Sequence, residues 1–152
     1  MLLTRASEYA LLSLDIIRNS EKPKGAEQLS TELCIPKSFL AKILQGLAKA
    51  DILVSRKGAH GGFVMIKKAK EISVAEIIIA AEGKTPAVFD CTQYSTTCPN
   101  GAIGLCSISP FLVTFQNKID TFLHELTLED IFNQWIFTTF LILTLMAMAV
   151  NT

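Results

Sequence analysis

The sequence of 152 residues lacks the groupings that most enzymes need and has no excess of charge of either sign. It contains only two histidines, and no phosphate-binding loop, Ser/His/Asp grouping or pair of carboxylates stands out along it. Fourteen basic and fourteen acidic residues give a formal net charge of zero. The missing groupings argue against an enzyme, and the zero net charge predicts no class of partner for the chain as a whole.

The zero net charge conceals an asymmetry between the two halves of the sequence. Residues 1–84 hold 13 of the 14 basic and 9 of the 14 acidic residues, so this half is positive and the remainder is negative. The asymmetry predicts a surface for a polyanion in the N-terminal half, although a solvated basic face would show the same composition. Within 37–70 only Asp51 opposes the basic residues, which are Lys37, Lys42, Lys49, Arg56, Lys57, Lys67, Lys68 and Lys70.

The sequence also lacks an export signal, because Arg5 and Glu8 interrupt the apolar residues at its start. We therefore expect a cytoplasmic protein, whose four cysteines are not joined in disulfides. Cys34 stands alone and is expected to be a small core residue between two helices. Three clustered thiols in a reducing compartment more often bind metal or perform redox chemistry. These three are Cys91, Cys98 and Cys106.

Turn signals and apolar periodicity predict a compact arrangement of helices in residues 1–84. Helices are expected over 5–19, 26–33 and 37–49, with Thr4 capping the first of them. The runs "ILVSRK" and "GFVMIKK" flank "GAHGG", which predicts a β-hairpin with a glycine-rich tip. A short helix is expected between Ser73 and Gly83. This order of elements is typical of a winged helix-turn-helix, so the predicted fold class is mainly α.

The predicted helix over 37–49 is amphipathic and suited to the major groove of DNA. Lys37, Ser38 and Lys42 lie near its start, where side chains of a recognition helix reach base edges and phosphates. Its opposite face is expected to be buried and consists of Phe39, Leu40, Ile43, Leu44 and Leu47.

The predicted hairpin supplies a second candidate contact with DNA. Arg56 and Lys57 stand at its base, where they can reach the sugar-phosphate backbone or the minor groove. Gly61 and Gly62 would let the main chain approach phosphates closely. The alternative is a winged helix that contacts another protein instead of DNA.

The spacing of the three clustered cysteines, C-x6-C-x7-C, leaves several chemistries open. Structural zinc sites usually contain closely spaced pairs of ligands, which this stretch does not have. Wider gaps suit an iron–sulfur cluster, although three cysteines are one ligand short of the usual four. Cluster, zinc, a thiol redox switch and no function all remain possible from spacing alone.

Several motifs, in their order along the chain, resemble the Rrf2 family of bacterial winged-helix repressors. These are "MLLTRASEYALLSL", "IPKSFLAKILQGLAKADIL", "VSRKGAHGGF", "SVAEII" and the three-cysteine stretch, and the similarity covers about residues 1–132. The resemblance implies a homodimer in which a long helix, here about 106–126, crosses its partner. Family members with three cysteines, such as the IscR and NsrR types, bind a 2Fe–2S or 4Fe–4S cluster. Oxidation, nitrosylation or loss of that cluster changes their affinity for DNA.

The resemblance also implies roles for individual residues. Cys91, Cys98 and Cys106 match the cluster cysteines of the family. The histidine that serves IscR-type members as the fourth ligand is replaced here by Ser109. Glu8 stands where NsrR-type members supply an acidic ligand from the other protomer, which favours NO sensing slightly over iron–sulfur homeostasis.

The DNA side of the resemblance is only partly transferable. Ser38 and Lys57 fall where IscR-type members place residues that contact bases. The glutamate that those members carry early in the recognition helix is Ala41 here, so their operator sequence cannot be transferred.

The C-terminal end departs from the family, because residues 131–152 contain no charged side chain. Fifteen of residues 131–150 are apolar, enough to span a bilayer as a helix. A membrane tether, a helix packed against the dimer and a tail from a shifted reading frame are all compatible with this composition.

Together these patterns predict a four-part chain and a regulatory function. We expect a transcription regulator, a repressor, that binds a double-stranded DNA operator as a homodimer under control of an iron–sulfur cluster. A cluster-free thiol-sensing regulator and a membrane-attached metal- or thiol-binding adaptor are the alternatives. The predicted parts are a DNA-binding domain, a cysteine loop, a dimerisation helix and an apolar tail, over residues 1–84, 85–108, 109–130 and 131–152.

Overall fold

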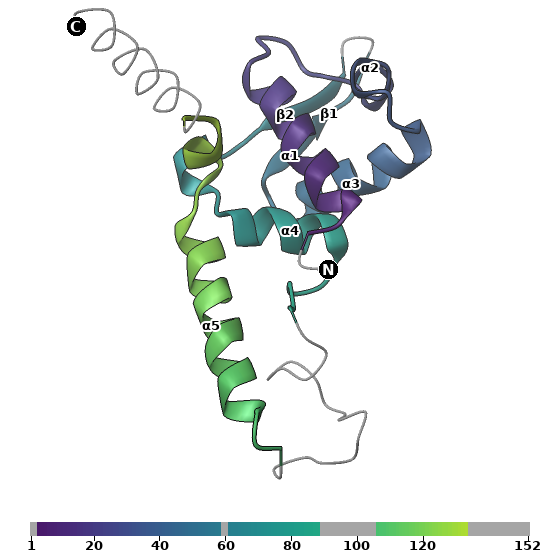
Figure 1. Cartoon of the computed structure of the whole chain (residues 1–152). Helices are drawn as coiled ribbons and strands as arrows, with labels where there is room; N and C mark the ends of the chain where they lie inside the picture. Colours follow the sequence, from purple (N-terminus) through teal and green to yellow (C-terminus); the bar gives the residue numbers. More distant parts are fainter. Residues whose placement is uncertain (1–2, 59–60, 89–105, 134–152) are drawn as a thin grey trace, which may run out of the picture.

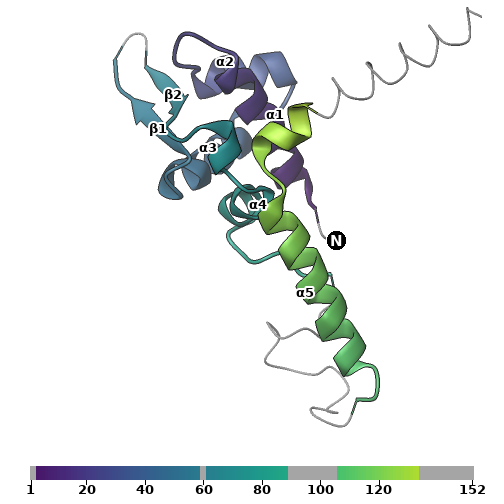
Figure 2. The ribbon, with the colours of Figure 1, turned by 90° about the vertical axis from the view of Figure 1, so that its left-hand side faces the viewer.

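The computed structural model describes residues 3–58, 61–88 and 106–133, and it confirms the mainly helical winged-helix fold. Helices α1 to α4 and the ribbon of β1 and β2 gather into one body, from which α5 projects (Figures 1 and 2). In chain order the elements are α1 (Arg5–Arg18), α2 (Ala26–Leu33), α3 (Lys37–Lys49), β1 (Leu53–Arg56), β2 (Gly62–Met65), a 3-10 turn (Ala69–Glu71), α4 (Val74–Glu82) and α5 (Ser109–Glu125).

The predicted helix ends are set by local hydrogen bonds. Thr4 Oγ1 accepts the N–H of Ala6 at 3.2 Å and so caps α1. Ser73 Oγ accepts the N–H of Glu76 at 3.2 Å, and Glu76 Oε2 accepts the N–H of Ser73 at 2.9 Å. This reciprocal pair satisfies two N–H groups that a helix start otherwise leaves without a partner. Gly83 ends α4 with a φ of 71°, a conformation that glycine adopts without strain.

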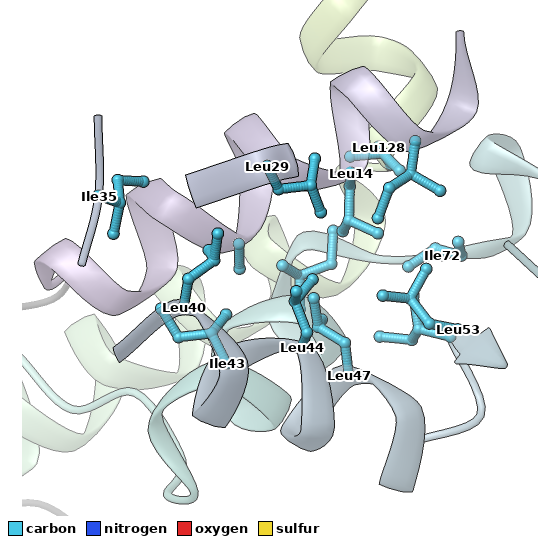
Figure 3. Packing of buried hydrophobic residues seen from close by; sticks show 14 residues of the cluster. Leu14, Leu29, Ile35, Leu40, Ile43, Leu44, Leu47, Leu53, Ile72 and Leu128 are labelled. Atoms are coloured by element: carbon cyan, nitrogen blue, oxygen red, sulfur yellow. The ribbon is translucent and has the colours of Figure 1, made fainter. Parts of the chain in front are cut away.

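The larger of two apolar clusters lies within the winged-helix body (Figure 3). Leu14 of α1, Leu29 of α2 and Leu44 of α3 are each 0% exposed. Each fully buried leucine contributes about 2 kcal/mol relative to an exposed one. Leu128, which follows α5 in the sequence, lies in the same cluster and is also 0% exposed.

Helices α3 and α4 approach each other closely at Gly46. A Cβ atom built on Gly46 would lie 2.2 Å from the carbonyl oxygen of Ala80 in α4. No side chain fits in that space, so glycine is required for this contact between the two helices. The helix predicted to read DNA is therefore packed backbone to backbone on the helix that precedes the cysteine stretch.

The ribbon is antiparallel and is fixed to the connection between α1 and α2. Leu53 pairs with Met65 and Arg56 pairs with Gly62. Phe63 on β2 exchanges two backbone hydrogen bonds with Lys24, at 2.9 and 3.1 Å. The connection before α2 is thus joined to β2 by an isolated antiparallel bridge.

Two side chains predicted to be buried are exposed instead. Cys34 is not a core residue, because it ends α2 in the left-handed conformation, with φ 54° and ψ 40°, and its side chain faces solvent. Ile35 occupies the core position in its place and is 4% exposed. Phe39 is 40% exposed in the first turn of α3, and its ring packs nearly perpendicular to the Tyr9 ring, with centroids 5.9 Å apart.

The chain turns back to the winged-helix body after α5. The helix ends at Glu125, earlier than the end of the predicted 109–130 segment, because Leu126 is extended. Val74 N–H then donates to the Leu126 carbonyl oxygen at 2.8 Å, and Leu128 N–H donates to the Ile72 carbonyl oxygen at 2.9 Å. These bonds place both ends of the connection from α5 against the start of α4.

The start of the predicted apolar tail belongs to this returning segment. The Arg18 guanidinium lies 4.2 Å from the centroid of the Phe132 ring, and Phe132 packs against the main core. Among the residues that the structure describes, no helix has the length and apolar character needed to cross a membrane. The rest of the predicted tail, from residue 134, lies outside the described residues.

Candidate nucleic-acid interface and metal site

The start of α3 presents the polar face that the sequence predicts. Lys37, Ser38 and Lys42 are exposed, and Leu40 and Ile43, on the opposite side, are 0% and 2% exposed. The helix therefore shows one polar face to solvent while its other face forms the core. This is the arrangement by which a recognition helix enters a major groove.

The predicted DNA-contacting cations differ in whether an acidic side chain already pairs with them. Lys37 Nζ lies 2.9 Å from Glu27 Oε2, and their side chains are 59% and 79% exposed, so this ion pair contributes little. Lys42, Arg56 and Lys57 form no ion pair within the described part of the chain. These three cations can approach phosphates without first breaking an internal contact.

The two predicted wing glycines have structural roles inside the protein. A Cβ on Gly61 would lie 2.4 Å from the Arg56 carbonyl oxygen, and one on Gly62 would lie 2.6 Å from the Lys24 carbonyl carbon. Both glycines are thus required to close the hairpin and to pack it on the connection before α2. The close approach to phosphates that the sequence predicts for them remains a prediction.

Of the three predicted cluster cysteines, only Cys106 lies among the described residues. Its thiol is free and half-buried, and its carbonyl oxygen accepts the N–H of Ser109 at 3.2 Å, directly before α5. Cys91 and Cys98 lie outside the described residues. Within the described ranges, no group of three metal-ligating side chains is found, and the ligand set remains a prediction.

Glu8, the predicted fourth ligand, is exposed in the first turn of α1. That end of α1 is tied to α4, because Glu82 Oε1 accepts the N–H of Thr4 at 3.1 Å and the hydroxyl of Ser7. Glu8 therefore lies on the helix end that adjoins the point where the chain leaves α4 towards the cysteines (Figure 1).

Sequence reasoning missed Gln116, which is 0% exposed within α5. Its amide binds the main chain at Pro86 and Val88, on the segment that leads to Cys91. The signal was present in the sequence, because Gln116 lies four residues after Leu112 and seven before Leu123, within the stripe that α5 buries.

Helix α5 also carries large apolar side chains that are partly exposed. Phe111, Phe115 and Phe122 are 64%, 37% and 57% exposed, and Ile108 directly before the helix is 58% exposed. Phe111 and Phe115 stack on each other, with ring centroids 6.1 Å apart. An apolar surface of this kind is typical of a protein–protein contact.

Comparison with known proteins identifies relatives over nearly the whole chain. The sequence profile of the Rrf2 family, described as iron-dependent transcriptional regulators, matches residues 3–134. Protein rrf2 of Nitratidesulfovibrio vulgaris is 33% identical over 107 residues, which cover 69% of this chain and 71% of that protein. The transcriptional regulator IscR of Photorhabdus laumondii is 30% identical over 135 residues, or 88% of this chain and 80% of that one.

Solved structures show the same fold. The global cysteine regulator CymR of Bacillus subtilis is similar with a TM-score of 0.62 and 18% sequence identity, over 86% of this chain and 95% of that one. At that identity the similarity establishes the fold alone.

Proposed function

The chain belongs to the Rrf2 family of transcriptional regulators, and from this premise we propose that an iron–sulfur cluster controls its binding to promoter DNA. Its relatives are regulators and not enzymes, so the function to be explained is a change in DNA affinity. The observation that supports the proposal most strongly is positional. The stretch with the three cysteines begins after α4, and α4 packs backbone to backbone on the recognition helix at Gly46.

The DNA-binding face consists of the start of α3 and the turn end of the ribbon, where Arg56 pairs with Gly62. Ser38 and Lys42 would enter the major groove, and Arg56 and Lys57 would contact the backbone of the same duplex. The exposed apolar face of α5 would be covered by the same face of a second copy. Such a homodimer presents two recognition helices to two half-sites of an operator, as a repressor of this family would.

The residues available for the cluster fit its chemistry. Cys91, Cys98 and Cys106 provide three soft sulfur donors, the ligands that iron–sulfur clusters take. The partner's Glu8 would complete the site, consistent with its exposure at the start of α1. When bound, the cluster would supply sensitivity to oxidation, to NO or to the iron–sulfur status of the cell.

The contacts of α4 with α1 and α3 provide a route by which a change in the cysteine loop would alter DNA binding. Glu82 at the end of α4 holds the start of α1, and Gly46 holds α3 against Ala80. A rearrangement of the loop would therefore act on a helix that has close contacts with both. The expected result is a change in the spacing of the two recognition helices of the dimer.

Anaerobic purification tests the proposal. The wild-type protein should be coloured and should contain iron and acid-labile sulfide, and Cys98→Ala should lose both. Cys34→Ala is the matched control, because Cys34 is exposed at the end of α2 and is not a proposed ligand. A colourless, iron-free wild-type protein under these conditions would contradict the proposal.

The assignment of Glu8 has its own test. Glu8→Ala should release its cluster faster in air than the wild-type protein does, because a carboxylate ligand is lost. The neighbouring substitution Arg5→Ala is the control for a change of charge at the same exposed helix end. Equal rates of cluster loss in Glu8→Ala and the wild-type protein would reject this ligand.

A thiol-sensing regulator without a cluster is the second candidate. It is favoured by the free thiols of Cys34 and Cys106, which are exposed and half-buried respectively. In that case an oxidant such as diamide would change the DNA affinity of iron-free protein, and a reductant would restore it. The adaptor alternative gains no support from relatives that are transcriptional regulators.

A further inference from the structure

The segment that leads into the cysteine loop is held by one buried amide. Gln116 Oε1 accepts the N–H of Val88 at 2.9 Å, and Gln116 Nε2 donates to the carbonyl oxygen of Pro86 at 3.1 Å. The same Nε2 donates to Asp120 Oδ1 at 2.7 Å. The side chain is 0% exposed, and both of its donors and its acceptor are used.

This pairing fixes the direction of the chain as well as its position. The Val88 N–H can only donate and the Pro86 carbonyl can only accept, so the amide of Gln116 fits in a single orientation. It contacts the peptide groups on either side of Ala87, as a neighbouring β-strand does. A buried apolar side chain at this place would leave both peptide groups without their partner.

The location of the amide connects it to the proposed metal site. Cys91 follows Val88 by three residues, and Cys106 precedes α5 by three residues. Gln116 lies seven residues along α5 from Ser109, which corresponds to about 10 Å of helix. Both ends of the cysteine loop are therefore fixed on the same helix, the entry through Gln116 and the exit because the chain continues from Cys106 into α5.

We propose that Gln116 is a positioning residue that holds the entry to the cysteine loop so that the cysteines can bind the cluster. This inference rests on the proposed function, because it assigns a role toward the cluster. Gln116 itself donates no ligand. Its effect passes through Pro86 and Val88 to the chain that carries Cys91.

The variant that isolates the hydrogen bonds is Gln116→Met, because methionine has a similar length and is apolar. Leu112→Met is the matched control, since Leu112 is buried one turn earlier on α5 and donates no hydrogen bond from its side chain. In cluster-free protein, hydrogen exchange at the Val88 amide should be at least about tenfold faster in Gln116→Met than in the control.

In anaerobically purified protein, the visible absorption of Gln116→Met should disappear in air about five to ten times faster than that of the wild type. The reason is that the entry to the cysteine loop is no longer held in place. Its visible circular dichroism, which reports the geometry around the cluster, should also change. Leu112→Met should match the wild-type protein in both. If Gln116→Met does not fold, Gln116→Glu serves instead, because its carboxylate still accepts the Val88 N–H while the bonds to Pro86 and Asp120 are lost.

The outcomes separate this inference from the proposed function. A wild-type protein without iron overturns the proposed function and the inference with it. A cluster-loaded wild type, together with a Gln116→Met variant of equal cluster lifetime and equal circular dichroism, overturns the inference alone. In that case faster exchange at Val88 would show that Gln116 only stabilises the fold.

Discussion

Helix α3 of the winged-helix body and helix α5 are both amphipathic, but their apolar side chains differ in how much they are exposed. In α3 the apolar residues Leu40, Leu44 and Leu47 are all 0% exposed, because α1, α2 and α4 cover them. In α5 the aromatic residues Phe111 and Phe122 are more than half exposed. The apolar residues of α3 are thus buried within one chain, whereas part of the apolar face of α5 is exposed.

The difference indicates where the stability and the regulation of the protein reside. The body is stabilised by helix caps, by the larger apolar cluster and by a backbone contact between α3 and α4. Helix α5 has a small contact with the body through Leu123 and the start of α4, and it anchors the cysteine loop through Gln116. We infer that the body holds the DNA-reading geometry and that the second region responds to the partner and to the signal.

The largest expected effect comes from Gly46→Ala, which disturbs the contact between α3 and α4 within the body. The added Cβ would lie 2.2 Å from the Ala80 carbonyl oxygen, so α3 and α4 must separate. We expect a loss of about 3 kcal/mol or more in the free energy of unfolding, measured by urea denaturation. Gly25→Ala is the control, because its Cβ would meet no atom closer than 3.9 Å and should cost less than about 1 kcal/mol. Equal stability of the two variants would contradict the close packing of α3 on α4.

The second expected effect concerns the open face of α5. Phe122→Ser removes a large apolar contact, so the dimer dissociation constant should rise about 30-fold, which corresponds to about 2 kcal/mol. Sedimentation equilibrium measures it. Ile66→Ser on the ribbon is the matched control, because Ile66 is 55% exposed and Phe122 is 57% exposed. A dimer that is weakened equally by both changes would show that α5 is not the interface.

The third expected effect separates an unpaired cation from a paired one within the body. Lys42→Ala should weaken binding to operator DNA about tenfold and lower the salt slope by about one. Lys67→Ala is the control, since Lys67 Nζ already lies 3.4 Å from Glu76 Oε1. Fluorescence anisotropy across a series of salt concentrations measures both. Similar losses in the two variants would indicate a diffuse basic surface instead of a recognition helix.

The smallest expected effect is the pH dependence of one helix cap. Burial raises the pKa of Glu76, but hydrogen bonds from Ser73 and the ion pair with Lys67 bring it below its ordinary value. This stability is therefore present above the ordinary pKa of 4.5 and is lost as the pH falls through the lower folded-state pKa. Glu76→Gln should reduce the acid-induced decrease in the free energy of unfolding. The change should be less than about 1 kcal/mol, because the side chain is 41% exposed.

Thermal unfolding between pH 3 and pH 6 measures the effect of that cap, with Glu125→Gln as the control. Glu125 is exposed, and its side chain forms no hydrogen bond or ion pair within the described part of the chain. A slope that is unchanged in Glu76→Gln would show that the cap does not contribute.

Sequence reasoning located the helices and the ribbon because their ends are set by local signals. Thr4, Ser73 and Gly83 act within a few residues of themselves, so their roles follow from the sequence. Cys34 was misplaced because its left-handed conformation depends on how α2 meets α3. The return of the chain at Leu128 depends on contacts with a segment more than fifty residues earlier.

In the candidate site, too, some features follow from the local sequence and others depend on contacts between distant segments. The exposure of Lys42 follows from helical periodicity, whereas Lys57 is exposed because it lies in the turn directly after β1. The internal requirement for Gly62 and the anchor at Gln116 depend on contacts between distant segments, which periodicity does not reveal. The roles of Cys91 and Cys98 remain predictions from residue type and family resemblance.

The most direct test of the account compares one preparation of the protein in two states. An operator duplex is first selected from a random pool by anaerobic protein, and its dissociation constant is then measured with cluster-loaded protein and with protein stripped of iron by a chelator. We predict that the two constants differ by at least about tenfold at the same salt concentration. Equal constants, with both states folded and dimeric, would contradict control of DNA binding by the cluster.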